Sequence, residues 1–266
     1  MPFVTVAGQK VFYTYQGWDD AAARSHPALV LIHGAGGNHL YWPPQLRHLA
    51  GGPVYALDLP AHGRSAGESC TTIAGAAAWL RAFVDALKLP AFVLAGHSMG
   101  GAIALDFALT YPGQLIGLGL VGTNARLRVA PAILQGLQHD FTGTTAQLIE
   151  LMYAPTAPTQ HKELALQRLR EVDPAVLQSD FSACDQFDVS ARVTEITLPT
   201  LIICGQQDKM TPVKYSERLH EQIHQSELHL LADAGHMVML EQPAAVTQLF
   251  GDFLASLNPT PATGER

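Results

Sequence analysis

Short runs of apolar residues, each bounded by turn residues, recur along the chain and predict strands. From position 28 onward the runs are rich in Val, Ile and Leu without clean alternation, as expected for strands that a parallel sheet buries on both faces. The first two runs flank the turn Ala7–Lys10 and predict an antiparallel hairpin. The predicted strands are Phe3–Val6, Val11–Tyr15, Ala28–Ile32, Val54–Leu57, Phe92–Ala95, Leu115–Val121, Leu201–Cys204 and Leu228–Leu231.

Between the later apolar runs, polar and apolar positions follow a helical period. The alternation of strand and helix predicts the α/β class, with a mostly parallel, doubly wound sheet covered by helices on both faces. The predicted helices of this alternation are Thr71–Leu87, Met99–Tyr111, Val213–His224 and Ala244–Leu257.

This alternation is interrupted between Asn124 and Arg192, where no strand-like run occurs. The segment has apolar residues at helical spacing, broken by prolines. We therefore predict one core made of residues 1–124 and 192–266, with a helical insertion at 125–191. Two ordinary crossover helices with long loops are the alternative, although loops of that length are unusual. Beyond the last helix, Asn258–Arg266 carries two prolines and a glycine and is expected to fray.

Composition narrows the possible functions. Hydrophobic residues make up 48% of the 266 positions, charged residues make up 15%, and the formal net charge is −7. Disordered chains need low hydrophobicity and high charge, so this composition excludes them. Binding to nucleic acid needs a dense basic face, which argues against a nucleic-acid partner.

Targeting signals and cysteines point to the cytoplasm. The chain has no window of 18 apolar residues, so no membrane span is predicted. No basic region precedes an apolar stretch at the N-terminus, so no signal peptide is predicted. The three cysteines, Cys70, Cys184 and Cys204, are odd in number and far apart, which favours reduced thiols in a cytoplasmic protein.

A candidate nucleophile lies in Gly96-His97-Ser98-Met99-Gly100, which fits the pattern G-x-S-x-G. The motif follows a predicted strand and opens a predicted helix, as a nucleophile elbow requires. In such a turn the serine adopts a strained conformation, and side chains at Gly96 or Gly100 would clash. A glycine-rich turn with an incidental serine is the alternative.

A serine hydroxyl needs a base, and the base needs an acid that orients it. His236 follows the last predicted strand, and Asp208 follows the strand before it. Both positions lie beyond the carboxyl ends of parallel strands, where open α/β sheets bind ligands. Asp233 is a rival acid, but it is three residues from His236 on the same loop and would reach the far ring nitrogen poorly. Weaker rivals lie in the insertion: Asp180, Asp185 and Asp188.

The glycine-rich turn His33-Gly34-Ala35-Gly36-Gly37 follows the strand Ala28–Ile32. Acyl transfer generates an oxyanion, which two preorganised backbone N–H groups stabilise. We expect Met99, at a helix N-terminus, to supply one of them, and Ala35 in this turn to supply the other. Gly36 is the alternative donor. The alternative is a purely structural turn, whose glycines only let the backbone pass close to the serine.

A second motif, His220-Glu221-Gln222-Ile223-His224, fits the zinc metalloprotease pattern H-E-x-x-H. On the predicted helix the two histidines share a face, but Val213, Leu219 and Ile223 form the stripe expected to face the core, which leaves the histidines on or near the solvent side. No third ligand follows at the spacing that a catalytic zinc site needs. We therefore predict a solvated helix and no metal site.

These features together resemble the α/β-hydrolase fold family over nearly the whole chain. Ser98, Asp208 and His236 occur in the family's chain order. The turn Asp58–Ser65 is similar to the family's D-x-P-G-x-G-x-S turn, with alanine at 61 where glycine is usual. The segments similar to its acid and histidine loops are Asp208-Lys209-Met210-Thr211-Pro212, Gly235-His236 and Glu241-Gln242-Pro243.

The resemblance implies an eight-stranded sheet, a helical cap, catalytic roles for Ser98, Asp208 and His236, and no cofactor. Within the family, a serine nucleophile argues against dehalogenases and epoxide hydrolases, which use aspartate. Met237 stands where C–C bond hydrolases commonly have tryptophan. Carboxylesterase activity on a small, uncharged ester is therefore the leading hypothesis. Lactonase, perhydrolase (cofactor-free haloperoxidase), C–C bond hydrolase and non-catalytic ligand receptor are the alternatives.

Other residues near the predicted site have less specific patterns. His62 and His97 are expected to be hydrogen-bonded structural residues rather than catalysts. An acyl pocket could be lined by Trp42, Phe141, Met152 and Met237, each of which could equally belong to the core. The chain itself leaves the oligomeric state open.

Overall fold

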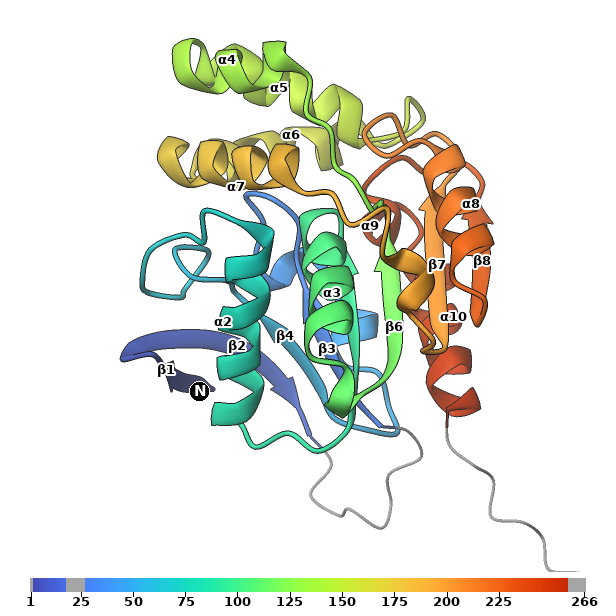
Figure 1. Ribbon diagram of the computed structural model, residues 1–266. Helices are drawn as coiled ribbons and strands as arrows, with labels where there is room; N and C mark the ends of the chain where they lie inside the picture. Colours follow the sequence, from blue (N-terminus) through green and yellow to red (C-terminus); the bar gives the residue numbers. More distant parts are fainter. Residues whose placement is uncertain (1, 18–26, 258–266) are drawn as a thin grey trace, which may run out of the picture.

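Eight strands form a single sheet in the computed structural model of the protein, which describes residues 2–17 and 27–257 (Figure 1). The tail Asn258–Arg266 lies outside the described residues. The strand order is β1-β2-β4-β3-β5-β6-β7-β8, which confirms the predicted eight-stranded sheet. The strands are β1 Phe3–Val6, β2 Gln9–Gln16, β3 Ala28–Ile32, β4 Val54–Leu57, β5 Phe92–His97, β6 Leu115–Val121, β7 Thr200–Gly205 and β8 Ser226–Leu231.

The sheet is mostly parallel. β1 and β2 form the predicted antiparallel hairpin, and β2 also pairs antiparallel with β4. From β4 to β8 every neighbouring pair is parallel. β5 is longer than the predicted Phe92–Ala95, because Gly96 pairs with Leu120 and His97 with Val121 of β6. This extension carries the strand directly into the turn at Ser98.

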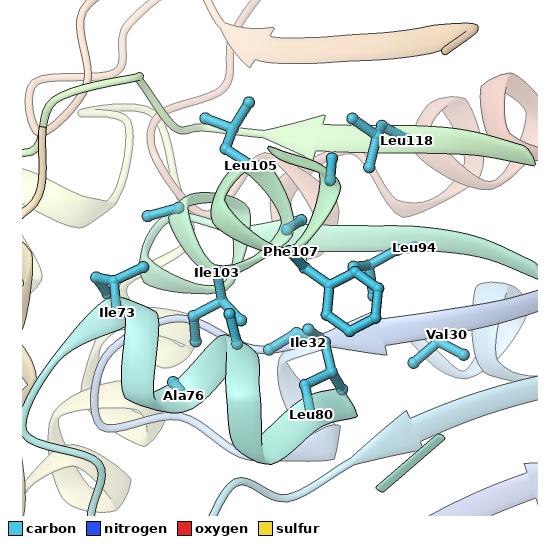
Figure 2. Close-up of a cluster of buried hydrophobic side chains, with 14 of the residues drawn as sticks. Val30, Ile32, Ile73, Ala76, Leu80, Leu94, Ile103, Leu105, Phe107 and Leu118 are labelled. Carbon is cyan, nitrogen blue, oxygen red and sulfur yellow. The ribbon is translucent and has the colours of Figure 1, made fainter. Parts of the chain in front are cut away.

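Helices cover both faces of the sheet, so it is doubly wound as predicted. On one face Ile73 and Leu80 of α2 and Phe107 of α3 meet the strand residues Val30 and Leu94 (Figure 2). On the other face α1 and α10 contribute Leu46 and Phe250, which belong to a cluster with the alternate strand residues. The helices of the two layers are α1 Pro44–Arg47, α2 Ile73–Ala86, α3 Met99–Thr110, α8 Val213–Gln222, α9 Val238–Glu241 and α10 Pro243–Ser256.

Four further helices lie above the carboxyl ends of the strands (Figure 1). They are α4 Pro131–His139, α5 Phe141–Met152, α6 Thr159–Arg170 and α7 Pro174–Gln186, and we call them the α4–α7 layer. Pro131 and Pro174 occupy the first turns of α4 and α7, where a missing N–H costs nothing. The two ends of the layer meet, because Arg126 bridges to Asp188 with a 3.0 Å ion pair.

Within residues 2–17 and 27–257, three short 3₁₀ helices connect these elements: η2 His39–Tyr41, η3 Pro112–Gln114 and η4 Val193–Glu195. Among the described residues, no helix combines the length and the apolar character needed to cross a membrane.

Candidate active site

Ser98 lies at the N-cap of α3, in the tight turn that leaves β5. Its φ of 53° and ψ of −116° place a non-glycine residue in a strained conformation. A Cβ on Gly96 would lie 2.0 Å from the carbonyl oxygen of Gly100, and one on Gly100 would lie 2.4 Å from that of Ile32. Both glycines are therefore required for the close approach of strand and helix that holds Ser98 in this position.

Asp208 and His236 lie together beyond the carboxyl ends of β7 and β8. His236 Nδ1 is 2.9 Å from Asp208 Oδ2, and both side chains are buried. Because a carboxylate accepts, Nδ1 carries the proton and Nε2 is the basic nitrogen of the ring. His236 lines the same pocket as Ser98, so the structure brings together all three residues that the sequence predicted.

The carboxylate of Asp208 is held by several donors. Oδ1 accepts the backbone N–H groups of Met210 at 2.8 Å and Thr211 at 2.7 Å, and Oδ2 accepts the Thr211 hydroxyl at 2.8 Å. Burial acts to raise the pKa of Asp208, but nearby His236 and the hydrogen bonds from His236 and Thr211 outweigh it, so the pKa is lowered. Asp208 is thus an anion that stabilises a positive charge on His236.

Two backbone N–H groups near Ser98 have no hydrogen-bond acceptor among the described residues of the protein. Within the described part of the chain, neither Ala35 N–H nor Met99 N–H donates a hydrogen bond to a protein atom. Ala35 also lines the pocket. The alternative donor Gly36 is not available, because its N–H donates to Asp180 Oδ2 at 2.8 Å. The structure therefore contradicts the Gly36 alternative.

Two buried histidines support the loops around Ser98. His97 Nε2 donates to the backbone oxygen of His236 at 3.0 Å, and burial together with nearby His236 lowers the pKa of His97. His33 Nδ1 donates to Gly34 O at 2.8 Å, while its Nε2 accepts from Leu59 N–H at 3.1 Å. Burial and the charge of His62 lower the pKa of His33 to about 4. His97 and His33 are therefore neutral structural residues.

The wall of the pocket is mostly apolar. Its volume is about 60 Å³, and α5, α6 and α7 supply part of the lining. Of the pocket residues suggested by the sequence, Met152 lies in this wall. Sequence reasoning missed Tyr41, Leu127, Arg128, Val129, Leu148, Leu169, Phe181, Cys184, Met210 and Thr211. Of these only Thr211 carried a local signal, because a threonine three residues after Asp208 can form a side-chain turn with it.

The other suggested pocket residues lie elsewhere. Trp42 is fully buried on the α10 side of the sheet, where its ring meets Phe250 at a centroid distance of 6.2 Å. Phe141 begins α5 and does not line the pocket, and Met237 lines a neighbouring cavity instead. The prediction that Trp42, Phe141 and Met237 line the pocket is therefore wrong, because the spacing of residues along the sequence does not show how the loops pack.

The H-E-x-x-H motif does not form a helical pair of ligands. α8 ends at Gln222, two residues earlier than predicted, because Ile223 is extended and fully buried. His224 is therefore off the helix, and His220 Nδ1 is instead 2.9 Å from Ser226 Oγ. Among the described residues no three His, Cys, Asp or Glu side chains group as metal ligands would.

Comparison with known sequences identifies relatives over most of the chain. The sequence profile described as "alpha/beta hydrolase fold" matches residues 27–243. A pimeloyl-[acyl-carrier protein] methyl ester esterase of Neisseria meningitidis is 30% identical over 241 residues, covering 85% of this chain and 92% of that protein. A 2-hydroxy-6-oxononadienedioate/2-hydroxy-6-oxononatrienedioate hydrolase of Paraburkholderia phymatum is also 30% identical, covering 85% and 86%.

Comparison with solved structures also finds an esterase of similar fold. A thermophilic esterase superposes with a TM-score of 0.83 at 32% identity, covering 97% of this chain and 98% of that one. The match extends over both the sheet and the α4–α7 layer, since so little of either chain is left out.

Proposed function

The chain belongs to the alpha/beta hydrolase fold family, and we propose that it is a serine carboxylesterase that cleaves small esters without a cofactor. The observation that carries the proposal is the shared pocket: Ser98 in its strained turn and His236 held by Asp208 at 2.9 Å line one apolar cavity. Relatives named as esterases in both comparisons support the same chemistry.

The proposed reaction starts at Ser98 Oγ. His236 Nε2 takes the hydroxyl proton as Oγ attacks the ester carbonyl carbon, and Asp208 orients His236 and stabilises its charged form. The N–H groups of Met99 and Ala35 hold the resulting oxyanion, each worth roughly 2.7–4 kcal/mol by precedent. The intermediate then collapses, and the alcohol leaves with the proton from His236.

A water molecule completes the cycle. His236 removes a proton from the water, the hydroxyl oxygen attacks the acyl carbon, and a second oxyanion forms in the same place. Its collapse breaks the bond to Oγ, which regains a proton from His236, and the carboxylic acid is released. No step requires a metal or a cofactor.

We further propose that residues 125–191 act as a cap domain on a core made of 1–124 and 192–266. The support is that the α4–α7 layer lies over the carboxyl ends of the strands (Figure 1), that its helices α5, α6 and α7 line part of the pocket of Ser98, and that Arg126 and Asp188 join its two ends. We also propose a cytoplasmic location, because the odd number and wide separation of the cysteines in the sequence favour reduced thiols.

The first test is the substitution Ser98→Ala. We expect kcat for p-nitrophenyl butyrate to fall by on the order of 10⁶, because the nucleophile is lost. A fluorophosphonate should label wild-type Ser98 stoichiometrically and leave the variant unlabelled. A folded Ser98→Ala protein that retains most of its esterase activity would refute the mechanism, and ligand binding without turnover in the wild type would favour a receptor.

A further inference from the structure

Asp180 is a buried carboxylate that the proposed reaction does not use. It lies in α7, and its side chain is 3% exposed. Its Oδ2 accepts the backbone N–H of Gly36 at 2.8 Å and is 2.8 Å from His62 Nε2. One oxygen atom thus joins the α4–α7 layer to two separate loops of the sheet edge.

The hydrogen bonds of His62 determine its charge. Nδ1 is 2.9 Å from the backbone oxygen of Pro60, which can only accept, so Nδ1 carries a proton. Nε2 faces the carboxylate of Asp180, which also accepts. Only an imidazolium ion has two N–H groups, so His62 and Asp180 form a buried ion pair in which both nitrogens donate.

Gly36 transmits this contact to the oxyanion site. Its φ of 61° is a conformation that favours glycine, and a Cβ there would lie 2.6 Å from Leu177 Cδ1 of α7. The residue before it is Ala35, which lines the pocket of Ser98 and whose N–H has no protein acceptor among the described residues. A shift of Gly36 away from Asp180 would turn the Ala35–Gly36 peptide. The Gly34–Ala35 peptide, which carries the Ala35 N–H, is bonded to the same Ala35 Cα, so the donor would move with it.

We propose that Asp180 is a positioning residue that, paired with His62, holds the Gly36 amide and thereby fixes the Ala35 N–H in the oxyanion site. The role of Ala35 in this inference rests on the proposed esterase function. The anchoring of Gly36 by Asp180 does not, and it can be measured separately.

The pairing makes the site sensitive to rising pH. Burial acts to lower the pKa of His62, but the hydrogen bond and charge of Asp180, the Pro60 carbonyl and the charge of Asp58 outweigh it, so the pKa is raised above 6.5. The other titratable groups around the pair include the neutral His33 ring, 5.0 Å from the ring of His62, the thiols of Cys70 and Cys184, and the Tyr41 hydroxyl, which all interact with the charge of Asp180. As pH rises through the raised pKa, His62 loses one proton and one of its two hydrogen bonds.

Two substitutions of Asp180 and one control test the proposal. Asp180→Ala removes both contacts. Asp180→Asn keeps an oxygen for the Gly36 N–H but removes the charge opposite His62. Asp173→Asn is the matched control, because Asp173 caps the same helix by accepting from Ala175 N–H, and asparagine caps equally well. Folding of each variant is checked by circular dichroism and thermal unfolding.

For Asp180→Ala we expect kcat for p-nitrophenyl butyrate to fall at least about tenfold with KM little changed, since removing an oxyanion donor outright costs roughly 10²–10³. The inhibition constant of a trifluoromethyl ketone, whose carbonyl forms an anionic adduct with Ser98, should rise by a similar factor. For Asp180→Asn we expect a kcat between those of Asp180→Ala and the wild type, and we expect the decline of kcat that accompanies loss of the His62 proton to disappear. Asp173→Asn should match the wild type.

Amide hydrogen exchange of the segment 33–40 gives a readout that does not depend on ester hydrolysis. We expect faster exchange in Asp180→Ala than in the wild type or in Asp173→Asn. Unchanged exchange, or a rise in KM with kcat and ketone inhibition unaltered, would overturn the positioning role. If the wild type hydrolyses no ester but exchange is faster in Asp180→Ala, the proposed function fails while the anchoring stands.

Discussion

At the scale of single residues, the proposed base depends on how completely Asp208 is hydrogen-bonded. Its two oxygens accept from the N–H groups of Met210 and Thr211, the hydroxyl of Thr211 and Nδ1 of His236. A carboxylate offers about four acceptor sites, so none is left for a competing donor. The carboxylate therefore has one orientation, and that orientation sets the tautomer of His236.

Replacing Asp208 by Asn should disable this base while leaving the shape of the site unchanged. The amide NH₂ donates where the carboxylate accepted, so His236 Nδ1 becomes an acceptor and the proton moves to Nε2. A ring protonated at Nε2 cannot take the proton of Ser98. We expect kcat to fall by on the order of 10⁴, as measured with p-nitrophenyl butyrate.

The matched control is Asp233→Asn. Asp233 is the rival acid in the sequence, and the structure places it exposed on the same loop as His236, with a φ of 54° that asparagine tolerates. Activity of this variant should stay within about twofold of the wild type, because an exposed substitution of this kind changes stability little. An equal loss in both variants would mean that Asp208 is not the orienting acid.

At the scale of elements, sequence patterns predict the segments whose conformation depends on residues close by in the chain. The strands and the turn at Ser98 follow from local apolar runs and from Gly96 and Gly100. Local spacing does not predict α7, because a proline such as Pro174 is expected to interrupt a helix. In the structure Asp173 and Pro174 instead form the N-cap and first position of the helix.

The contacts that the sequence could not predict join distant segments. Asp180 and Gly36 are 144 positions apart, and no periodicity relates them. Likewise, the early end of α8 depends on the burial of Ile223 in the core, which outweighs the helical pattern that continues to His224. Tertiary packing decides both features, so local propensity gives no guide to them.

A carboxylate in α9 connects the histidine loop to the α4–α7 layer. Glu241 Oε1 accepts from Gly235 N–H and Oε2 accepts from Ala154 N–H, both at 2.8 Å. We expect Glu241→Ala to lower the free energy of unfolding by roughly 2–4 kcal/mol, because both buried N–H groups lose their acceptor. Urea unfolding followed by circular dichroism measures this change.

The neighbouring Gln242 provides the control for Glu241. Its side chain makes an exposed hydrogen bond of 3.3 Å to the backbone oxygen of Ala232. Gln242→Ala should therefore change the free energy of unfolding by no more than about 0.5 kcal/mol. Similar losses in the two variants would show that the connection through Glu241 contributes nothing specific.

At the scale of the whole molecule, two cavities lie side by side between the sheet and the α4–α7 layer. The cavity at Ser98 has a volume of about 60 Å³. The second has about 180 Å³, with apolar lining and with Leu40 and Leu164 exposed at its rim. Tyr41 and Met152 line both cavities, and we therefore infer that these two residues form the partition between them.

This partition should set the length of acyl chain that the enzyme accepts. A cavity of about 150 Å³ admits a benzene-sized group, so the cavity at Ser98 suits only short chains. We expect kcat/KM to be highest for p-nitrophenyl acetate to butyrate and to fall for octanoate. Met152→Ala should join the cavities and raise kcat/KM for octanoate relative to butyrate at least about tenfold, since each newly buried methylene contributes about 0.8 kcal/mol.

Met152→Leu separates the effect of the partition from the effect of altered packing. Leucine nearly conserves the volume of methionine, so this variant should keep the wild-type preference for short chains. The backbone oxygen of Met152, which accepts from Met237 N–H at 3.0 Å, is retained in both variants. If a folded Met152→Ala protein keeps the wild-type chain-length profile, the second cavity does not hold the acyl chain, and the limit on chain length lies in the fixed wall formed by Leu148 and Phe181.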